Sequence, residues 1–270
     1  MVETVLEVSG LQKSYRTVHA VDDVSFRLPA GGSLGIVGES GSGKTTTARI
    51  VVGLERADSG QVRINGRDRA PERRRGKEHR LARAKDVQMV FQDPYLSLDP
   101  RISVGTALRE PLALHSPQRR DHSARVAELL DQVGLGTRMA DSLPRQLSGG
   151  QRQRVAIARA LAVEPAVLVL DESVAALDVS VQAQILNLLS DIREQTGISY
   201  LFITHDLGVV QCVTDEVLVM RQGRVVEAGP TAQVLAEPRH PYTRLLLDSV
   251  PQPGWDPRRL TEERRAAARE

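Results

Sequence analysis

The chain has 270 residues, of which 41% are hydrophobic and 26% charged, a composition typical of a soluble globular protein with a sizeable core. A net charge of +2 is too small to argue by itself for a nucleic-acid partner. The single cysteine, Cys212, excludes a disulfide within the chain and a cysteine metal cluster, and we expect it to be a small buried side chain.

Neither a membrane span nor a signal peptide is predicted. No apolar run approaches the roughly 18 residues of a spanning helix, and residues 1–11 are polar and strand-like. We therefore expect a protein that is soluble by itself and cytosolic, and that reaches any membrane process through a partner.

The first third of the chain predicts strands around a glycine-rich loop. Residues 5–8 and 21–28 nearly alternate apolar and polar side chains, which indicates strands with one exposed face. Residues 34–37 are an apolar run typical of a buried strand, and residues 46–54 have apolar side chains at helical spacing. The loop between them, Gly38–Thr45, reads Gly-Glu-Ser-Gly-Ser-Gly-Lys-Thr.

This loop has the composition of a phosphate-binding site. Its glycines let successive backbone N–H groups turn inward, and the helix that follows directs the positive end of its dipole at the same place. Lys44 adds a charge for the β- and γ-phosphates, and Thr45 offers a hydroxyl to Mg²⁺. A chance match is the alternative, and the flanking strand and helix argue against it. The predicted phosphate-binding residues are Gly38, Ser40, Gly41, Ser42, Gly43, Lys44, Thr45 and Thr46.

The middle of the chain combines a charged stretch with a helical segment. Residues 67–85 are mostly basic, and we interpret them as a solvated helix or loop, with a surface for anionic lipid headgroups as the alternative. A strand over 61–64 precedes them, and a strand over 87–91 follows them and ends at Gln92. We predict that about residues 94–160 form a helical insertion, with helices over 104–114, 125–133 and 151–161.

The α/β pattern resumes at residues 167–170, an apolar run that fits a parallel strand buried on both faces. From residue 229 we expect a tail whose charged end, 256–270, has a composition that favours disorder. Between and within these segments we predict a helix over 181–192, a strand over 200–203, a hairpin over 216–227 and short helices near 231–235 and 242–250.

Three apolar strands end in polar residues, and this pattern predicts a site. In open parallel sheets, ligands bind beyond the carboxyl ends of the strands. If the strands are neighbours, Asp171 is placed to hold Mg²⁺ through water, Glu172 to act as a general base, and His205 to donate to a γ-phosphate. Adjacent carboxylates alternate sides of an extended chain, so only one would face the metal. The alternatives are a solvated strand end and a structural histidine.

Leu147–Gln151 predicts a second helix N-terminus that suits a phosphate. Ser148 would cap the helix, and the N–H groups of Gly149 and Gly150 are available. Because this stretch ends the helical insertion, we interpret it as serving a nucleotide held by another subunit. The alternative is a plain cap with glycines for packing.

In order and spacing, these motifs resemble the ATP-binding-cassette (ABC) ATPases over about residues 4–250. The resemblance implies an α/β fold of the P-loop NTPase type, with a RecA-like core, an antiparallel β subdomain and an inserted helical subdomain. It implies an ATPase domain over residues 1–230 and a C-terminal extension over 231–270. The matching segments are Gly38–Thr45, Gln92, Leu147–Gln151, Val167–Glu172, Ala175–Asp178 and His205.

The resemblance also implies ATP and Mg²⁺ as ligands of a head-to-tail dimer with two ATP molecules at its interface. Tyr15 would stack on adenine, Gln92 would touch Mg²⁺ and sense the membrane partner, Glu172 would be the catalytic base and His205 the switch histidine. The implied metal ligands are Thr45, Gln92 and Asp171. The residues implied to contact the partner's ATP are Ser148, Gly149, Gly150, Gln151 and Asp178.

A finer resemblance is to importer ATPases of the dipeptide, oligopeptide and nickel group. Phe91–Pro94, Leu98–Arg101, Leu177–Ile185 and His240–Thr243 are similar to that group, and the chain lacks the cysteine cluster that some members carry in their extension. Ala175 stands where serine is usual, which puts communication between the two sites in doubt.

This finer resemblance implies the ATP-hydrolysing subunit of a di- or oligopeptide importer at the cytoplasmic face of the cell membrane. A second ATPase subunit, self or paralogue, and two membrane permease subunits would be its partners, with a solute-binding protein acting indirectly. The transported solute stays open. One alternative is a soluble assembly such as a carbon–phosphorus lyase complex. The other is a nucleic-acid-acting cassette protein, although the second cassette, coiled coil or zinc cysteines of such proteins are missing and we expect no nucleic acid.

Overall fold

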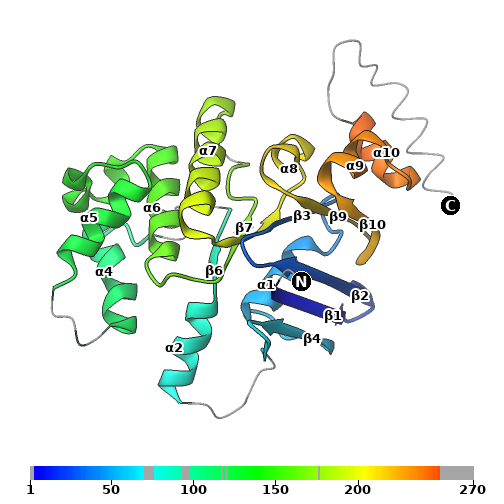
Figure 1. Ribbon diagram of the computed structural model, residues 1–270, viewed down its shortest axis with the longest axis horizontal. Helices are drawn as coiled ribbons and strands as arrows, with labels where there is room; N and C mark the ends of the chain where they lie inside the picture. Colours follow the sequence, from blue (N-terminus) through cyan, green and yellow to red (C-terminus); the bar gives the residue numbers. More distant parts are fainter. Residues whose placement is uncertain are drawn as a thin grey trace.

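The computed structural model describes residues 3–69, 76–92, 98–116, 118, 121–175 and 177–249. Two sheets lie next to each other near the centre of the molecule, with a group of helices at one side and the C-terminal helices at the other (Figure 1). Among the described residues, no helix is both long and apolar enough to cross a bilayer. The start of the predicted helical insertion, residues 93–97, and the end of the predicted tail lie outside the described ranges.

The larger sheet has six strands in the order β10-β9-β3-β8-β7-β6. Its strands are parallel except for the antiparallel pair of β9 and β10. The central strands β3, β7 and β8 are buried at every position, as their uninterrupted apolar runs predict. The strands are β3 (Ser33–Val37), β6 (Val87–Val90), β7 (Val167–Asp171), β8 (Ser199–Ile203), β9 (Glu216–Arg221) and β10 (Arg224–Pro230).

The smaller sheet is antiparallel, in the order β2-β1-β4-β5. Its first two strands are longer than the alternating segments 5–8 and 21–28, because pairing along β1 continues past a left-handed Gly10 and several register shifts. Apolar side chains from both sheets form one core cluster with α1. The strands are β1 (Thr4–Tyr15), β2 (Val18–Pro29), β4 (Ser59–Ile64) and β5 (Arg67–Asp68).

Most helices match the predicted ones to within a few residues. Between β6 and β7, helices α4, α5 and α6 lie together at one side of the molecule, as Figure 1 shows, and they share a core with α7. The α-helices are α1 (Lys44–Val52), α2 (Lys77–Asp86), α4 (Val104–His115), α5 (Ser123–Gln132), α6 (Gly149–Leu161), α7 (Val179–Thr196), α8 (Leu207–Val213), α9 (Thr231–Ala236) and α10 (Pro241–Asp248), and the 3₁₀-helices are η1 (Thr137–Asp141) and η2 (Pro144–Gln146).

Three local expectations were wrong. Cys212 is exposed, because it lies on the outer face of α8, a short helix that we did not predict. The strand expected over 61–64 begins earlier, since β4 starts at Ser59. The charged stretch is not wholly solvated: Arg69 is buried, donates to the backbone oxygens of Val52 and Arg83, and lies near a carboxylate of α2.

Candidate functional site

The carboxyl ends of β3, β8 and β7 meet at one edge of the larger sheet, as the sequence predicted. β8 lies between the other two, and Asp171 at the end of β7 is in register with Ile203 at the end of β8. The glycine loop leaves β3 here, and His205 follows β8 closely. The glycine loop and the polar residues that follow β7 and β8 therefore lie at the same edge.

The glycine loop is held between β2 and β9, and two of its glycines are required by that position. A Cβ at Gly38 would lie 2.2 Å from the carbonyl oxygen of Met220, and one at Gly43 would lie 2.2 Å from that of Ala20. Both glycines also have positive φ angles, 152° and 101°. The amide of Gly223 donates to Ser42 O at 3.0 Å, which attaches the loop to the turn between β9 and β10.

Gly38→Ala is expected to lower the free energy of unfolding by about 2–5 kcal/mol, because it combines left-handed strain with overpacking against a backbone oxygen. Gly66→Ala is the matched control, since Gly66 has a φ of 70° but its Cβ would meet nothing within 4 Å. The control should lose only about 1–2 kcal/mol. Urea denaturation measures both values. Equal losses would contradict the steric account of the loop.

Lys44 is buried, with 4% of its surface exposed, and its Nζ donates to Gly38 O and Glu39 O at 2.8 Å each. Burial lowers the pKa of Lys44, and the negative charges of Glu172, Asp171 and Glu39 partly offset that effect. A buried cation held by two loop carbonyls is well placed for an anion bound in the loop.

Asp171 and Glu172 point to different partners. Thr45 Oγ1 donates to Asp171 Oδ1 at 3.3 Å, whereas Glu172 Oε1 lies 3.3 Å from Nδ1 of His205. We expected an extended chain to separate the carboxylates, but Glu172 has a φ of 44°, which is left-handed and uncommon outside glycine. Such strain is often found at functional sites, and here it turns the Glu172 side chain towards β8.

The charge balance of this edge favours a cation. Burial raises the pKa of Asp171 above its ordinary value, the hydrogen bond from Thr45 opposes that shift, and the neighbouring Glu172 carboxylate raises the pKa further. Two carboxylates beside each other in a partly buried place are stabilised by a positive ion. Asp171 and Thr45 therefore fit the ligand set expected for Mg²⁺.

The start of α1 also fits an anion. Its N-cap is Gly43, and within the described structure no side chain caps it, whereas Ser148 caps α6 and Asp178 caps α7. Ser42 Oγ is buried and has no hydrogen-bond partner among the described residues. Uncapped N–H groups and an unpartnered hydroxyl are donors that phosphate oxygens would satisfy.

The second helix tip is built as predicted but lies elsewhere. Ser148 Oγ accepts from the amide of Gln151 at 3.2 Å, and Gln151 Oε1 accepts from the amide of Ser148 at 2.9 Å, so the two residues form a capping box. A Cβ at Gly150 would lie 2.5 Å from Val181 Cγ1, so close packing on α7 accounts for that glycine. Ser148 and Asp178 are exposed, and Figure 1 shows α6 beside α4 and α5, apart from α1.

Among the described residues, neither Tyr15 nor Gln92 is hydrogen-bonded to the group formed by Thr45, Asp171, Glu172 and His205. Tyr15 lies at the end of β1 with its ring exposed and Lys13 Nζ 5.1 Å from the ring centroid. Gln92 follows β6 at the same sheet edge with its side chain exposed, and within the described residues it makes no hydrogen bond to Asp171 or Thr45. Their predicted contacts to adenine and Mg²⁺ stay predictions.

Comparison with known proteins shows the family of this chain. Residues 21–175 match the family described as ABC transporter, and residues 226–269 match the one described as oligopeptide/dipeptide transporter, C-terminal region. A putative peptide import ATP-binding protein of Brucella abortus is 48% identical over 261 residues, covering 93% of this chain and 78% of that protein. The chain belongs to the ABC transporter ATPase family.

Other relatives of this ABC ATPase are longer than it is. OppD of Mycobacterium tuberculosis, an oligopeptide transport ATP-binding protein, is 49% identical over 249 residues, covering 92% of the chain, which spans 40% of OppD. The glutathione import ATP-binding protein GsiA of Salmonella typhi is 47% identical over 261 residues, again covering 92% of the chain, which spans 41% of GsiA.

Solved structures confirm the predicted fold class of the ABC ATPase. A dimeric structure of the ATP-binding cassette MJ0796 in a post-hydrolysis state, bound to ADP and Pi, superimposes with a TM-score of 0.74 at 28% identity. The superposition covers 84% of this chain and 98% of the MJ0796 chain. The α/β fold with an antiparallel sheet is therefore shown, as is an ATP-binding and ATP-hydrolysing family.

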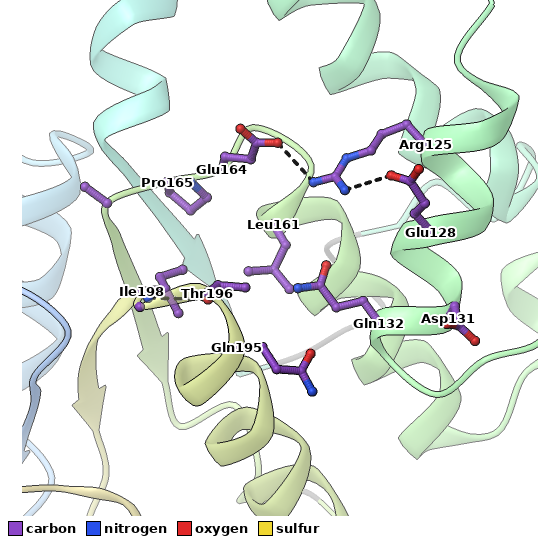
Figure 2. Close-up of a pocket in the computed structure, with 12 residues that line it drawn as sticks. Arg125, Glu128, Asp131, Gln132, Leu161, Glu164, Pro165, Gln195, Thr196 and Ile198 are labelled. Atoms are coloured by element: carbon purple, nitrogen blue, oxygen red, sulfur yellow. Dashed lines mark hydrogen bonds and ion pairs between the residues drawn. The ribbon is translucent and has the colours of Figure 1, made fainter.

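A cavity of about 660 Å³ lies elsewhere in the ABC ATPase. Figure 2 shows Arg125 of α5 between Glu128 and Glu164, with ion pairs of 3.0 Å and 3.2 Å. Two of the residues that line the cavity directly precede strands of the larger sheet: Ala166 precedes β7, and Ile198 precedes β8. The cavity is therefore at the amino ends of these strands, opposite the glycine loop.

Sequence reasoning missed the residues that hold the glycine loop from outside. Met220 and Ala20 offer backbone oxygens, which leave no signal in the sequence. Tyr242 did leave one, because His240–Thr243 was noted as a motif, but its contact with the loop was not foreseen.

Proposed function

We propose that this chain is the ATP-hydrolysing subunit of an importer for di- or oligopeptides or a related solute. The observation that carries the proposal is the pairing of an ABC transporter match over 21–175 with an oligopeptide/dipeptide transporter match over 226–269. Relatives named for peptide, oligopeptide and glutathione import support it. They do not favour the carbon–phosphorus lyase alternative.

In this proposal the glycine loop binds the phosphates of ATP. The loop amides, the α1 N-terminus and Ser42 Oγ donate to phosphate oxygens, and Lys44 neutralises part of their charge. Asp171 and Thr45 hold Mg²⁺, with Gln92 as a further ligand. When bound, Mg²⁺ neutralises charge that develops on the phosphates.

Glu172 is proposed to accept a proton from the attacking water. Its side chain is about one-fifth exposed, so solvent reaches the carboxylate. His205 lies 3.3 Å from it and is more than half exposed, which suits a group that contacts the γ-phosphate only when the nucleotide is present. The water oxygen forms a bond to the γ-phosphorus as the bond from that phosphorus to the β–γ bridging oxygen breaks, so that ADP leaves with the bridging oxygen and phosphate is released.

The proposed working unit is a head-to-tail dimer with a copy of this chain or a paralogue. Ser148, Gly149, Gly150, Gln151 and Asp178 of one subunit then contact the ATP of the other. Nucleotide bound between the subunits favours the closed state, since it contacts both subunits only there. Hydrolysis reopens the dimer, and two membrane permease subunits at the cytoplasmic face of the membrane convert this motion into transport.

Purification of the assembled complex tests the proposal. The tagged chain should co-purify with hydrophobic membrane subunits, and a peptide-loaded solute receptor should raise ATP turnover by the complex. Co-purification with soluble enzyme subunits only would contradict the importer function and leave the ATPase activity intact.

Ser148→Arg is expected to leave ATP binding by the single chain unchanged and to reduce turnover of the assembled complex at least about tenfold, because the larger side chain overpacks the subunit interface. Ser103→Arg is the control, since Ser103 caps α4 in the same way through the amide of Thr106. Loss of either cap costs about 1 kcal/mol of stability. Equal turnover by the two variants in a phosphate-release assay would contradict the contact in trans.

A further inference from the structure

The C-terminal region contacts the glycine loop directly. The backbone amide of Glu39 donates to the phenolic oxygen of Tyr242 at 3.0 Å. Tyr242 is the second residue of α10, and only 2% of its surface is exposed. It comes from the region that matches the oligopeptide/dipeptide transporter C-terminal family, outside the ABC transporter match.

This hydrogen bond acts on the peptide group that also holds Lys44. The Gly38–Glu39 peptide presents its N–H to Tyr242 and its carbonyl oxygen, Gly38 O, to Lys44 Nζ at 2.8 Å. The next carbonyl, Glu39 O, accepts from Lys44 Nζ at 2.8 Å and from the amide of Ser42 at 3.2 Å. Tyr242 therefore fixes the orientation of the peptide plane on which the Lys44 ammonium rests.

Tyr242 itself is fixed by short-range contacts at the start of α10. His240 Nδ1 accepts from the amide of Tyr242 at 3.1 Å and so caps the helix. Glu227 of β10 accepts from the amides of Arg239 and His240 at 2.8 Å and 3.1 Å, which attaches the start of the helix to the sheet.

The ring of Tyr242 is held from the sheet as well. The Arg221 guanidinium carbon lies 5.1 Å from the ring centroid, within the range of a cation–π contact. Arg221 directly follows Met220, whose carbonyl oxygen closes the space at Gly38. The side chain of Tyr242 and the end of β9 thus contact neighbouring residues of the loop, Glu39 and Gly38.

We propose that Tyr242 is a positioning residue for ATP, which couples the C-terminal region to the glycine loop. The inference rests on the proposed binding of ATP by that loop. A loop whose amide and lysine are already oriented loses less conformational freedom when the nucleotide binds. The His-Pro-Tyr-Thr sequence then has a physical purpose: a cap, a proline suited to the first helical turn, and a hydroxyl that reaches the loop.

Two tyrosine variants of the full chain test this role. Tyr242→Phe removes the hydroxyl and keeps the ring, and Tyr200→Phe is the matched control. Tyr200 is buried in the same way, with 1% exposed, and its hydroxyl donates to Leu189 O at 2.9 Å, away from the loop. Calorimetry with Mg-ATP gives the Kd, and thermal unfolding gives the stability of each variant.

We expect Tyr242→Phe to weaken Mg-ATP binding about threefold to tenfold, the contribution of one neutral hydrogen bond. Tyr200→Phe should lower the unfolding temperature and leave the Kd unchanged. In the assembled complex, Tyr242→Phe should raise the KM for ATP with little change in kcat, which a purely structural role would not produce. If Tyr242→Phe does not fold, Glu227→Gln, which weakens the attachment of α10, takes its place and should weaken binding in the same direction.

The possible outcomes separate this inference from the proposed function. If wild-type chain and Tyr242→Phe bind Mg-ATP equally, Tyr242 has no positioning role, although the loop still binds ATP. An equal loss of affinity in both tyrosine variants would also overturn the inference, because general destabilisation would explain it. If the wild-type chain binds no Mg-ATP, the proposed function itself fails.

Discussion

Glu172→Gln is expected to leave Mg-ATP bound and to reduce ATP turnover by about 10²–10⁴-fold, the usual contribution of a general base. Glutamine has almost the same shape and keeps an oxygen that can face His205, but it has no basic carboxylate. The backbone of Glu172 is held independently, since its amide donates to Ile203 O at 2.8 Å. Binding and chemistry should therefore separate in this variant.

Glu164→Gln is the matched control for this change. Glu164 also has a left-handed backbone, with a φ of 52° compared with 44° at Glu172. It pairs with Arg125 at the opposite end of the sheet, so its loss should not affect turnover. Calorimetry measures ATP binding, and phosphate release from the assembled complex measures turnover. Wild-type turnover by Glu172→Gln would refute the assignment of the base.

Lys44→Ala is expected to weaken Mg-ATP binding at least about thirtyfold. The ammonium is buried and oriented by two carbonyl oxygens, so removing it leaves a buried phosphate charge without its partner, which typically costs 2–5 kcal/mol. Lys85→Ala removes an exposed lysine of α2 and serves as the control. A titration with a fluorescent ATP analogue measures both affinities. Equal affinities would show that the loop lysine does not contact the phosphates.

Much of the fold could be predicted from the sequence, because its signals are local. The apolar runs of β3, β7 and β8 indicate buried parallel strands, and the polar residues that follow them indicate the edge where a ligand binds. The cap formed by Ser148 was also predictable, since serine three residues before a glutamine at a helix start is a capping box.

Other features depend on tertiary contacts that no local pattern records. We expected an extended chain at Glu172, but its backbone is left-handed. Its amide donates to Ile203 O at the end of β8, a contact that only the folded chain provides. The burial of Arg69 was hidden in a stretch of mostly charged residues, and two backbone oxygens and a carboxylate compensate its charge only in the folded chain. The outward position of Cys212 could have been foreseen if Asp206 had been recognised as the cap of a short helix.

The contact between Tyr242 and Glu39 joins residues far apart in the sequence, so it is another tertiary contact that no local pattern records. The motif around Tyr242 indicated membership of an importer group but gave no information about its position. Only the structure places the hydroxyl on the glycine loop. A sequence motif outside the residues that match the ABC transporter family thus contacts the glycine loop directly.

Calorimetric titration of the full chain with ATP, in the presence and absence of Mg²⁺, tests the central claim most directly. Our account predicts one nucleotide per chain, with affinity that depends on Mg²⁺ and falls when Lys44 is replaced by alanine. Absence of heat with Mg-ATP, or equal affinity with and without the metal, would contradict a site built from the glycine loop, Lys44 and Asp171.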